Sequence, residues 1–91
     1  MRWTLRYTKQ ALKFLKKTSE ASVESIDPYI RKAINKVILR QQTNINIQKM
    51  KGQWKGFYRI REGDLRIILK FEVDKQVVLI YRIGWRGDVY K

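Results

Sequence analysis

The stretch Gly56-Phe57-Tyr58-Arg59-Ile60-Arg61-Glu62-Gly63-Asp64-Leu65-Arg66 decides the fold, because apolar and charged residues alternate on both sides of a short turn. A period of two places successive side chains on opposite faces of a strand. Gly63-Asp64 between two such runs is typical of a two-residue hairpin loop, which makes the flanking strands antiparallel. The sequence therefore predicts paired strands over 57–61 and 65–73.

The chain continues with a second turn and a third predicted strand. Asp74-Lys75 forms the turn, and residues 76–83 are apolar at nearly every position, which suits a central strand covered on both faces. In the strand before it, one face is expected to pack under helices, because five apolar residues alternate there: Leu65, Ile67, Leu69, Phe71 and Val73. Consecutive hairpins make this half of the chain an antiparallel meander.

Helical periods replace strand periods upstream of the meander. Residues 3–7 alternate and predict a first strand, and the apolar spacing that follows predicts a helix over 9–18. Residues 18–26 are interpreted as a connection. Asp27-Pro28 is typical of a helix start, so a second helix is expected over 28–42. The predicted fold is an α+β sandwich: an N-terminal strand, two helices on one sheet, and a three- to four-stranded antiparallel meander.

Length, composition and charge limit the number of domains and the kind of partner that can be expected. With 91 residues, of which 44% are apolar, the chain is expected to form one folded domain, 1–91. The 21 Lys and Arg residues stand against 8 Asp and Glu residues, and the resulting +13 charge predicts a polyanionic partner. The sequence shows no signal peptide and no run near the ~20 apolar residues of a membrane span. A cytoplasmic protein without a membrane partner is expected.

Arginines recur at the ends of the predicted strands. Arg59 and Arg61 share one face of their strand, and the hairpin register places Arg61 directly across from Arg66. Like charges directly opposite each other destabilise a sheet by a few tenths to ~1 kcal/mol, so such a cluster predicts a bound anion. Arg86 follows the last strand, and Tyr90 supplies a hydroxyl for a phosphate or a ring for a base. The four arginines and Tyr90 form the candidate catalytic set.

A second group of residues is predicted to bind RNA or phosphate beside the arginines. Three lysines precede the meander and are expected to line the same cleft. Trp85 adjoins the last arginine, either as a packing residue or as a stacking platform for a base. The complete second group is Lys49, Lys51, Lys55, Trp85 and Lys91.

The residue types limit the chemistry of this site. The chain has no histidine and no cysteine, which excludes a histidine-based ribonuclease mechanism, thiol nucleophiles and zinc–thiolate sites. The close acid pair Glu62 and Asp64 of the meander occupies a turn, so no metal or other cofactor is expected. What remains is metal-free attack of a ribose 2′-hydroxyl on the adjacent phosphate, with cations stabilising the transition state. The general base stays open, because arginine stays protonated at physiological pH and cannot accept a proton.

The resemblance of this chain to a known family rests on two stretches, RIREGDLRII at 59–68 and IGWRGDVY at 83–90. Together with the order of elements over essentially the whole chain, they resemble the RelE/ParE superfamily of bacterial toxins, which are paired with antitoxins. The resemblance implies a RelE-like fold of the microbial ribonuclease type. RelE-like members cleave mRNA in the ribosomal A site, and ParE-like members instead poison DNA gyrase.

The residue pattern favours the ribonuclease branch of this superfamily. The RelE-like branch carries a basic pair, two further arginines and a tyrosine near the end, matched here by Arg59, Arg61, Arg66, Arg86 and Tyr90. Two departures concern the general base: arginines replace the lysines of the best-known RelE pair, and Trp85 stands where some relatives have histidine. The alternatives for the base are a ribosomal group or one of four lysines, Lys49, Lys51, Lys55 and Lys91.

The resemblance also implies partners. A cognate antitoxin, small and with an acidic or amphipathic segment, is expected to wrap the toxin, and the ribosome and mRNA are the further partners. Operator DNA is contacted only through the antitoxin. Two other functions stay open: a ParE-like gyrase inhibitor with no nuclease activity, and an inactive relative that binds an antitoxin or nucleic acid.

Overall fold

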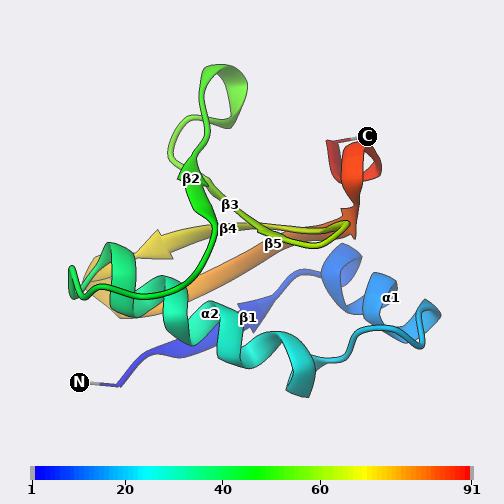
Figure 1. Cartoon of the computed structure of the whole chain (residues 1–91), viewed down its shortest axis with the longest axis horizontal. Coiled ribbons are helices and arrows are strands. Elements are labelled where there is room, and N and C mark those ends of the chain that lie inside the picture. The colour runs from blue at the N-terminus through cyan, green and yellow to red at the C-terminus, as the bar shows by residue number, and fades with distance from the viewer. Residues whose placement is uncertain (1, 91) are drawn as a thin grey trace.

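The chain folds into one five-stranded sheet with two helices on the same side of it (Figure 1). The structure, a computed structural model, describes residues 2–90, apart from the side chains of Asp88 and Tyr90. Its strands are β1 (Thr4–Tyr7), β2 (Ile47–Lys49), β3 (Tyr58–Glu62), β4 (Leu65–Glu72) and β5 (Val77–Trp85), its α-helices α1 (Lys9–Lys17) and α2 (Val23–Val37), and its 3₁₀ helices η1 (Gly52–Trp54), η2 (Val73–Lys75) and η3 (Arg86–Tyr90). The predicted α+β class is confirmed.

The strand order in the sheet is β1-β5-β4-β3-β2. β1 pairs in parallel with β5, and the other neighbours are antiparallel. The predicted hairpin register is confirmed, because Arg61 pairs with Arg66 across the Gly63-Asp64 loop. The predicted inner position of 76–83 is confirmed as well, since β5 lies between β1 and β4. The placement of Val73 under the helices is wrong: it lies in η2, beyond the end of β4, and is 56% exposed.

The second helix differs from its prediction at both ends. It begins at Val23 because Ser22 caps it: the Ser22 hydroxyl accepts a hydrogen bond from the Ser25 backbone N–H at 3.1 Å, and the Ser25 hydroxyl accepts one from the Ser22 N–H at 2.8 Å. Pro28 therefore lies within the helix, where it removes a single backbone bond. The helix ends at Val37 rather than at 42, because Arg40 adopts a left-handed conformation at φ 55° that turns the chain away.

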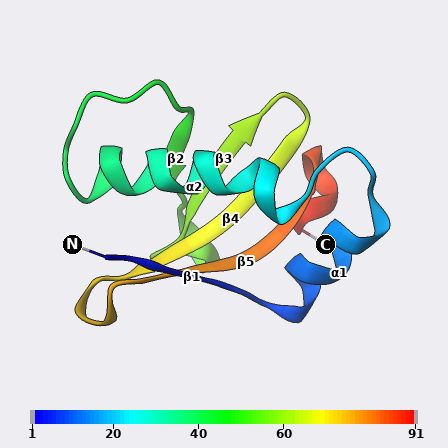
Figure 2. The same ribbon diagram turned by 90° about the horizontal axis from the view of Figure 1, so that it is seen from below.

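The main core lies between the helices and the sheet. Figure 2 shows α2 crossing the strands on this face. Neither described α-helix is long and apolar enough to span a membrane. Each helix and strand contributes one face to this core, and their buried residues are Ala11, Leu15, Ile26, Ile30, Ala33, Ile34, Ile60, Leu65, Ile67, Leu69, Val78, Ile80 and Ile83. Trp3 and Ala21, which lie outside these elements, belong to the same cluster. Burial of this apolar surface fixes which face of every strand points away from the helices.

The opposite face of the sheet, hereafter the outer face, is flanked by η1 and η3, which both rise from it (Figure 1). Gly84 allows η3 to lie against β5, because a Cβ at this position would meet the Val89 backbone Cα and N at 3.1 Å. Val89 is 1% exposed in consequence. The start of η3 is thereby held over the end of the β3–β4 hairpin, where the arginines gather.

Candidate phosphate-binding site

Four arginines from three elements line one hollow of about 420 Å³ on the outer face, hereafter the arginine hollow. β3 supplies Arg59 and Arg61, β4 supplies Arg66, and η3 supplies Arg86, followed in the lining by Gly87. Strand pairing explains the grouping, because Arg61 and Arg66 are directly opposite each other and Arg59 lies two residues before Arg61 on the same face. The structure therefore brings the four predicted arginines together.

Neighbouring groups hold the side chains of Arg59 and Arg66 in place. The Arg59 Nη2 donates to the Gln48 Oε1 at 3.1 Å, from the adjacent position on β2. The Arg66 Nη1 donates to two carbonyl oxygens of the hairpin, at 2.6 Å for Gly63 and 3.0 Å for Leu65. Guanidinium groups restrained in this way lose less freedom when they bind an oxyanion.

Arg86 is positioned by both its backbone and its side chain. Its backbone N–H donates to the Asp64 carbonyl at 2.8 Å, and its Nε donates to the Asp64 Oδ1 at 3.1 Å. The residue has a φ of 46°, a left-handed conformation that costs a non-glycine residue about 1–2 kcal/mol. Such conformations persist where surrounding structure over-determines them, and they cluster at functional sites.

The hollow is suited to a phosphate diester. Planar guanidinium groups donate paired hydrogen bonds to phosphate oxygens, and arginine stays charged at every physiological pH. Among the described side chains the lining contains no carboxylate, and no three described Asp and Glu side chains lie close enough together to hold a metal ion. The arrangement can bind a phosphate and stabilise additional negative charge that develops on it.

Arg82 is a residue that sequence reasoning missed. Its partner across the strands is Ile68, whose other neighbour is Arg59, so Arg82 lies in the same row of the outer face. The guanidinium carbon lies 5.3 Å from the Trp54 ring centroid and 5.5 Å from that of Tyr81, a cation–π arrangement. The available signal was that Arg82 is the single charged residue of the apolar run 77–85.

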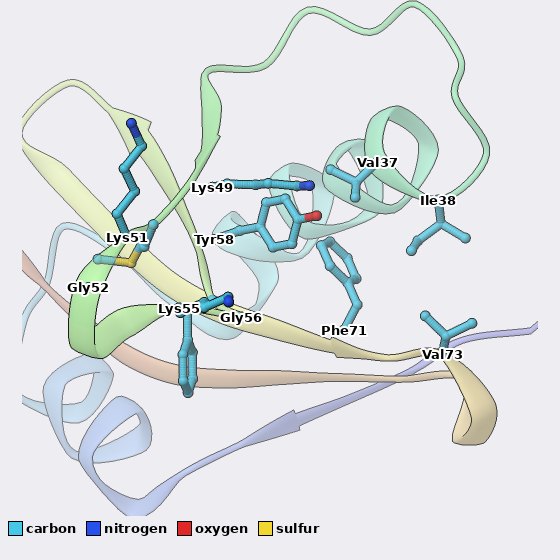
Figure 3. Close-up of a pocket in the computed structure, with 12 residues that line it drawn as sticks. Val37, Ile38, Lys49, Lys51, Gly52, Lys55, Gly56, Tyr58, Phe71 and Val73 are labelled. Carbon is cyan, nitrogen blue, oxygen red and sulfur yellow. The ribbon is translucent and has the colours of Figure 1, made fainter.

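The three predicted lysines do not share this hollow. Lys49, Lys51 and Lys55 line a separate hollow of about 640 Å³ beside the end of α2 (Figure 3). The expectation of a common cleft is wrong because side chains alternate along β2: Gln48 meets Arg59 on the outer face, and the next residue, Lys49, consequently faces the helices.

The remaining predicted residues are placed as follows. Trp85 belongs to β5 and packs against Phe14 of α1, with ring centroids 5.5 Å apart, so its packing role is confirmed. It also lines a hollow of about 460 Å³ together with Glu20, Asp64 and Arg86. The Tyr90 side chain and Lys91 lie outside the described part of the chain.

Comparison with known proteins decides the family. A sequence model described as the ParE toxin of the type II toxin–antitoxin system parDE matches residues 5–90. The chain belongs to this toxin family. A search of curated protein sequences found no match.

Solved structures of RelE-type toxins share the fold of this family member. A RelBE2 toxin–antitoxin complex from Mycobacterium tuberculosis is similar with a TM-score of 0.69 and 19% identity, over 94% of this chain and 100% of that one. A RelB–RelE complex from Methanococcus jannaschii has a TM-score of 0.66 and 26% identity, over 93% and 94%. YafQ from Escherichia coli has a TM-score of 0.63 and 14% identity, over 99% and 100%. The chain is thus a RelE/ParE-family toxin with a RelE-like fold.

Proposed function

We propose that this toxin cleaves mRNA on the ribosome and thereby stops translation. The observation that carries the proposal is the hollow lined by Arg59, Arg61, Arg66 and Arg86, which concentrates fixed positive charge where a phosphate diester fits. The proposal places the protein in the cytoplasm, with mRNA and the ribosome as its targets. The similar complexes from M. tuberculosis and M. jannaschii contain an antitoxin, which supports a cognate antitoxin as the partner of this chain.

The reaction that fits these residues is an internal transesterification of RNA. The 2′-oxygen of the ribose forms a bond to the adjacent phosphorus, and the bond from phosphorus to the 5′-oxygen of the next nucleotide breaks. The 2′-hydroxyl loses its proton, the 5′-oxygen gains one, and the products carry a 2′,3′-cyclic phosphate and a 5′-hydroxyl. Negative charge increases on the phosphate oxygens as the five-coordinate transition state forms, and the arginines stabilise it.

The general base of this proposal is not an arginine, because arginine as a residue type stays protonated at physiological pH and cannot accept the 2′-proton. Lys49, Lys51 and Lys55 line a different hollow from the arginines. This placement favours Tyr90, Lys91 or a ribosomal group as the base.

Primer extension on a translated message tests the cleavage. The purified toxin is added to a reconstituted translation system, beside Arg86→Ala, a reaction without ribosomes, and Arg6→Ala as a matched loss of one arginine on β1. Cuts at A-site codons should require the ribosome and fall about 10²–10³-fold with Arg86→Ala, as expected when one positioned donor is removed. Arg6→Ala should cut like the wild type. An intact message during normal translation would overturn the proposal.

A second candidate function rests on a different observation. The family model that matches residues 5–90 is that of ParE, and ParE-like toxins act on DNA gyrase rather than on RNA. Gyrase supercoiling assays with the same purified protein separate the two candidates. Accumulation of cleaved DNA–gyrase complexes beside an intact message would assign this chain to gyrase inhibition, and the arginine hollow would then bind DNA or gyrase.

A further inference from the structure

Three aromatic side chains form a cluster on the outer face of the sheet: Trp54 of η1, Phe57 just before β3, and Tyr81 of β5. This cluster is hereafter the aromatic platform. Each ring contacts the other two, with centroids 5.6 Å apart for Trp54 and Phe57, 5.9 Å for Trp54 and Tyr81, and 5.2 Å for Phe57 and Tyr81. All three residues are half-buried, so part of each remains accessible to a ligand.

The aromatic platform adjoins the arginine hollow. Arg59 of the hollow, Ile68 and Arg82 form one row across β3, β4 and β5. Neighbouring strands lie about 4.8 Å apart, so Arg82 is about 10 Å from Arg59 along this row. The Arg82 guanidinium in turn lies over the Trp54 and Tyr81 rings. One nucleotide is therefore long enough to place its phosphate in the hollow and its base at the platform.

Positive charge borders the aromatic platform on a second side. The Lys70 Nζ lies 5.7 Å from the centroid of the Phe57 ring. Lys70 follows Arg66 and Ile68 along β4 at the two-residue spacing that places all three on the outer face. Rings interleaved with cations are typical of surfaces that bind single-stranded nucleic acid, where the cations follow the backbone and the bases stack on the rings.

Backbone hydrogen bonds hold Trp54 in this position. The Phe57 N–H donates to the Trp54 carbonyl at 3.0 Å, and the Met50 N–H donates to the Phe57 carbonyl at 2.9 Å. These bonds close the segment between β2 and β3, and η1 consequently rises at one side of the outer face while η3 rises at the other (Figure 1). A ring that is already positioned loses little freedom when a base stacks on it.

We propose that the aromatic platform holds the base next to the phosphate bound in the arginine hollow, with Trp54 as the stacking residue and Arg82 as the cation between the two sites. The ligand is single-stranded RNA, so the proposal rests on the proposed function and adds the place of one flanking nucleotide. Stacking reads no hydrogen-bond pattern, and the platform should accept every base, purines more tightly than pyrimidines because their ring system is larger. Trp54 is thus a positioning residue for the scissile phosphate.

A dinucleotide tests the stacking, because its single phosphate can occupy the arginine hollow in only one register. The probe is adenylyl-3′,5′-adenosine with a 2′-O-methyl group on the 5′ ribose, which leaves no attacking hydroxyl. Its dissociation constant is measured at low salt by NMR titration. Trp54→Leu should weaken binding about five- to tenfold, near the lower end of the loss for one stacked base. Failure of the wild type to bind the dinucleotide would overturn the proposal.

Two further probes separate stacking from a change in the fold of η1. In one the 5′ base is replaced by hydrogen, and in the other the 3′ base. One of them should bind the wild type about five- to tenfold more weakly than the intact dinucleotide, and Trp54→Leu should then add less than about twofold to that loss. This probe shows on which side of the phosphate the stacked base lies. If the losses from probe and variant multiply for both probes, the proposal is overturned.

Arg82→Gln is a second variant, which changes the surface of β5 instead of η1. It should weaken binding of the intact dinucleotide about threefold at low salt, and the loss should fade as salt rises. Arg2→Gln is the matched control, because the exposed Arg2 lines a different hollow beside α2. Equal losses in the two variants would reduce the effect to net charge and overturn the role of Arg82.

The ribosomal cleavage assay separates this proposal from the proposed function. If the wild type cuts no message but Trp54→Leu and a probe without one base still show the same, non-multiplying loss, the platform stands and the nuclease falls. If the message is cut and the losses multiply, the platform proposal alone falls. The matching deoxyribose dinucleotide should bind no more tightly than the RNA probe. Tighter binding with the same dependence on Trp54 would assign the platform to single-stranded DNA and overturn RNA as its ligand.

Discussion

Asp64 holds Arg86 at two points, through its backbone carbonyl at 2.8 Å from the Arg86 N–H and through its carboxylate at 3.1 Å from the Arg86 Nε. The backbone contact fixes where η3 begins, and it does not depend on the Asp64 side chain. The side-chain contact is an exposed ion pair, with the two side chains 77% and 68% exposed. A carboxylate in this place competes with any phosphate for the same guanidinium.

Asp64→Asn should therefore strengthen the binding of RNA. Removal of the competing charge is expected to raise affinity about two- to fivefold at low salt, with the gain disappearing at high salt. The free energy of unfolding should change by less than ~1 kcal/mol, because exposed ion pairs contribute little. Binding is measured with a 2′-O-methyl oligoribonucleotide, which has no attacking hydroxyl.

Asp74→Asn provides the matched control for this prediction. It removes the same charge from the η2 turn, away from the arginine hollow. An equal gain in affinity for both variants would trace the effect to net charge. Weaker binding by Asp64→Asn would show instead that the carboxylate is needed to orient Arg86.

The cross-strand pair of Arg61 and Arg66 is expected to lower the free energy of unfolding while it supports mRNA cleavage. Arg61→Gln removes one of two like charges that face each other in the sheet, and should raise the free energy of unfolding by a few tenths to ~1 kcal/mol. The same change should lower mRNA cleavage about 10²–10³-fold. Urea unfolding and primer extension measure the two effects. Arg6→Gln, which faces Leu79 rather than a cation, should change neither; a destabilised Arg61→Gln would contradict the repulsion.

Sequence reasoning succeeded where local pattern and tertiary packing agree. Alternating residues on both sides of Gly63-Asp64 allow one register with Ile60 inside, and that register alone aligns Arg61 with Arg66. The start of α2 was missed because Ser22 and Ser25 form a reciprocal cap without the acidic residue of the usual pattern, and Pro28 gave a stronger false signal.

The errors at the site concern which face of the sheet a side chain lies on in a short or irregular strand. Lys49 lies in a three-residue strand, where a shift of one position exchanges the faces, so sequence spacing did not indicate which hollow it lines. Arg82 lies beside a register shift at which β5 contains one more residue than β4: Ile68 pairs with Arg82, and Leu69 with Ile80. The alternation of side chains between the two faces is therefore interrupted at Tyr81. The face on which Arg82 lies could be assigned only from the observed strand pairing.

Tyr7 makes stability depend on pH at the alkaline end. Burial raises the pKa of its hydroxyl above the usual 10.0, Asp27 and Glu24 raise it further, and Arg31 opposes them. Below pH 10 the hydroxyl is protonated in both states; above it the unfolded chain loses the proton first, so stability falls as pH rises. Urea unfolding of the wild type and Tyr7→Phe is measured between about pH 8 and 11. The two free energies of unfolding should run in parallel up to pH 10, and that of the wild type should fall more steeply beyond it. Curves that stay parallel to pH 11 would contradict the raised pKa.

Gly84→Ala should damage the arginine site without a change in any arginine. The added Cβ would lie 3.1 Å from the backbone Cα and N of Val89, so η3 must move away from β5, at a cost of about 1–3 kcal/mol in the free energy of unfolding. Because Arg86 begins η3, mRNA cleavage should fall with it. Gly87→Ala is the matched control for stability, since a Cβ there meets nothing within 4 Å. Adding Val89→Ala should not rescue Gly84→Ala, because the three close contacts are to the Val89 N, Cα and Cβ, and alanine keeps all three atoms. Recovery in the double variant would place the conflict in the outer part of the Val89 side chain instead.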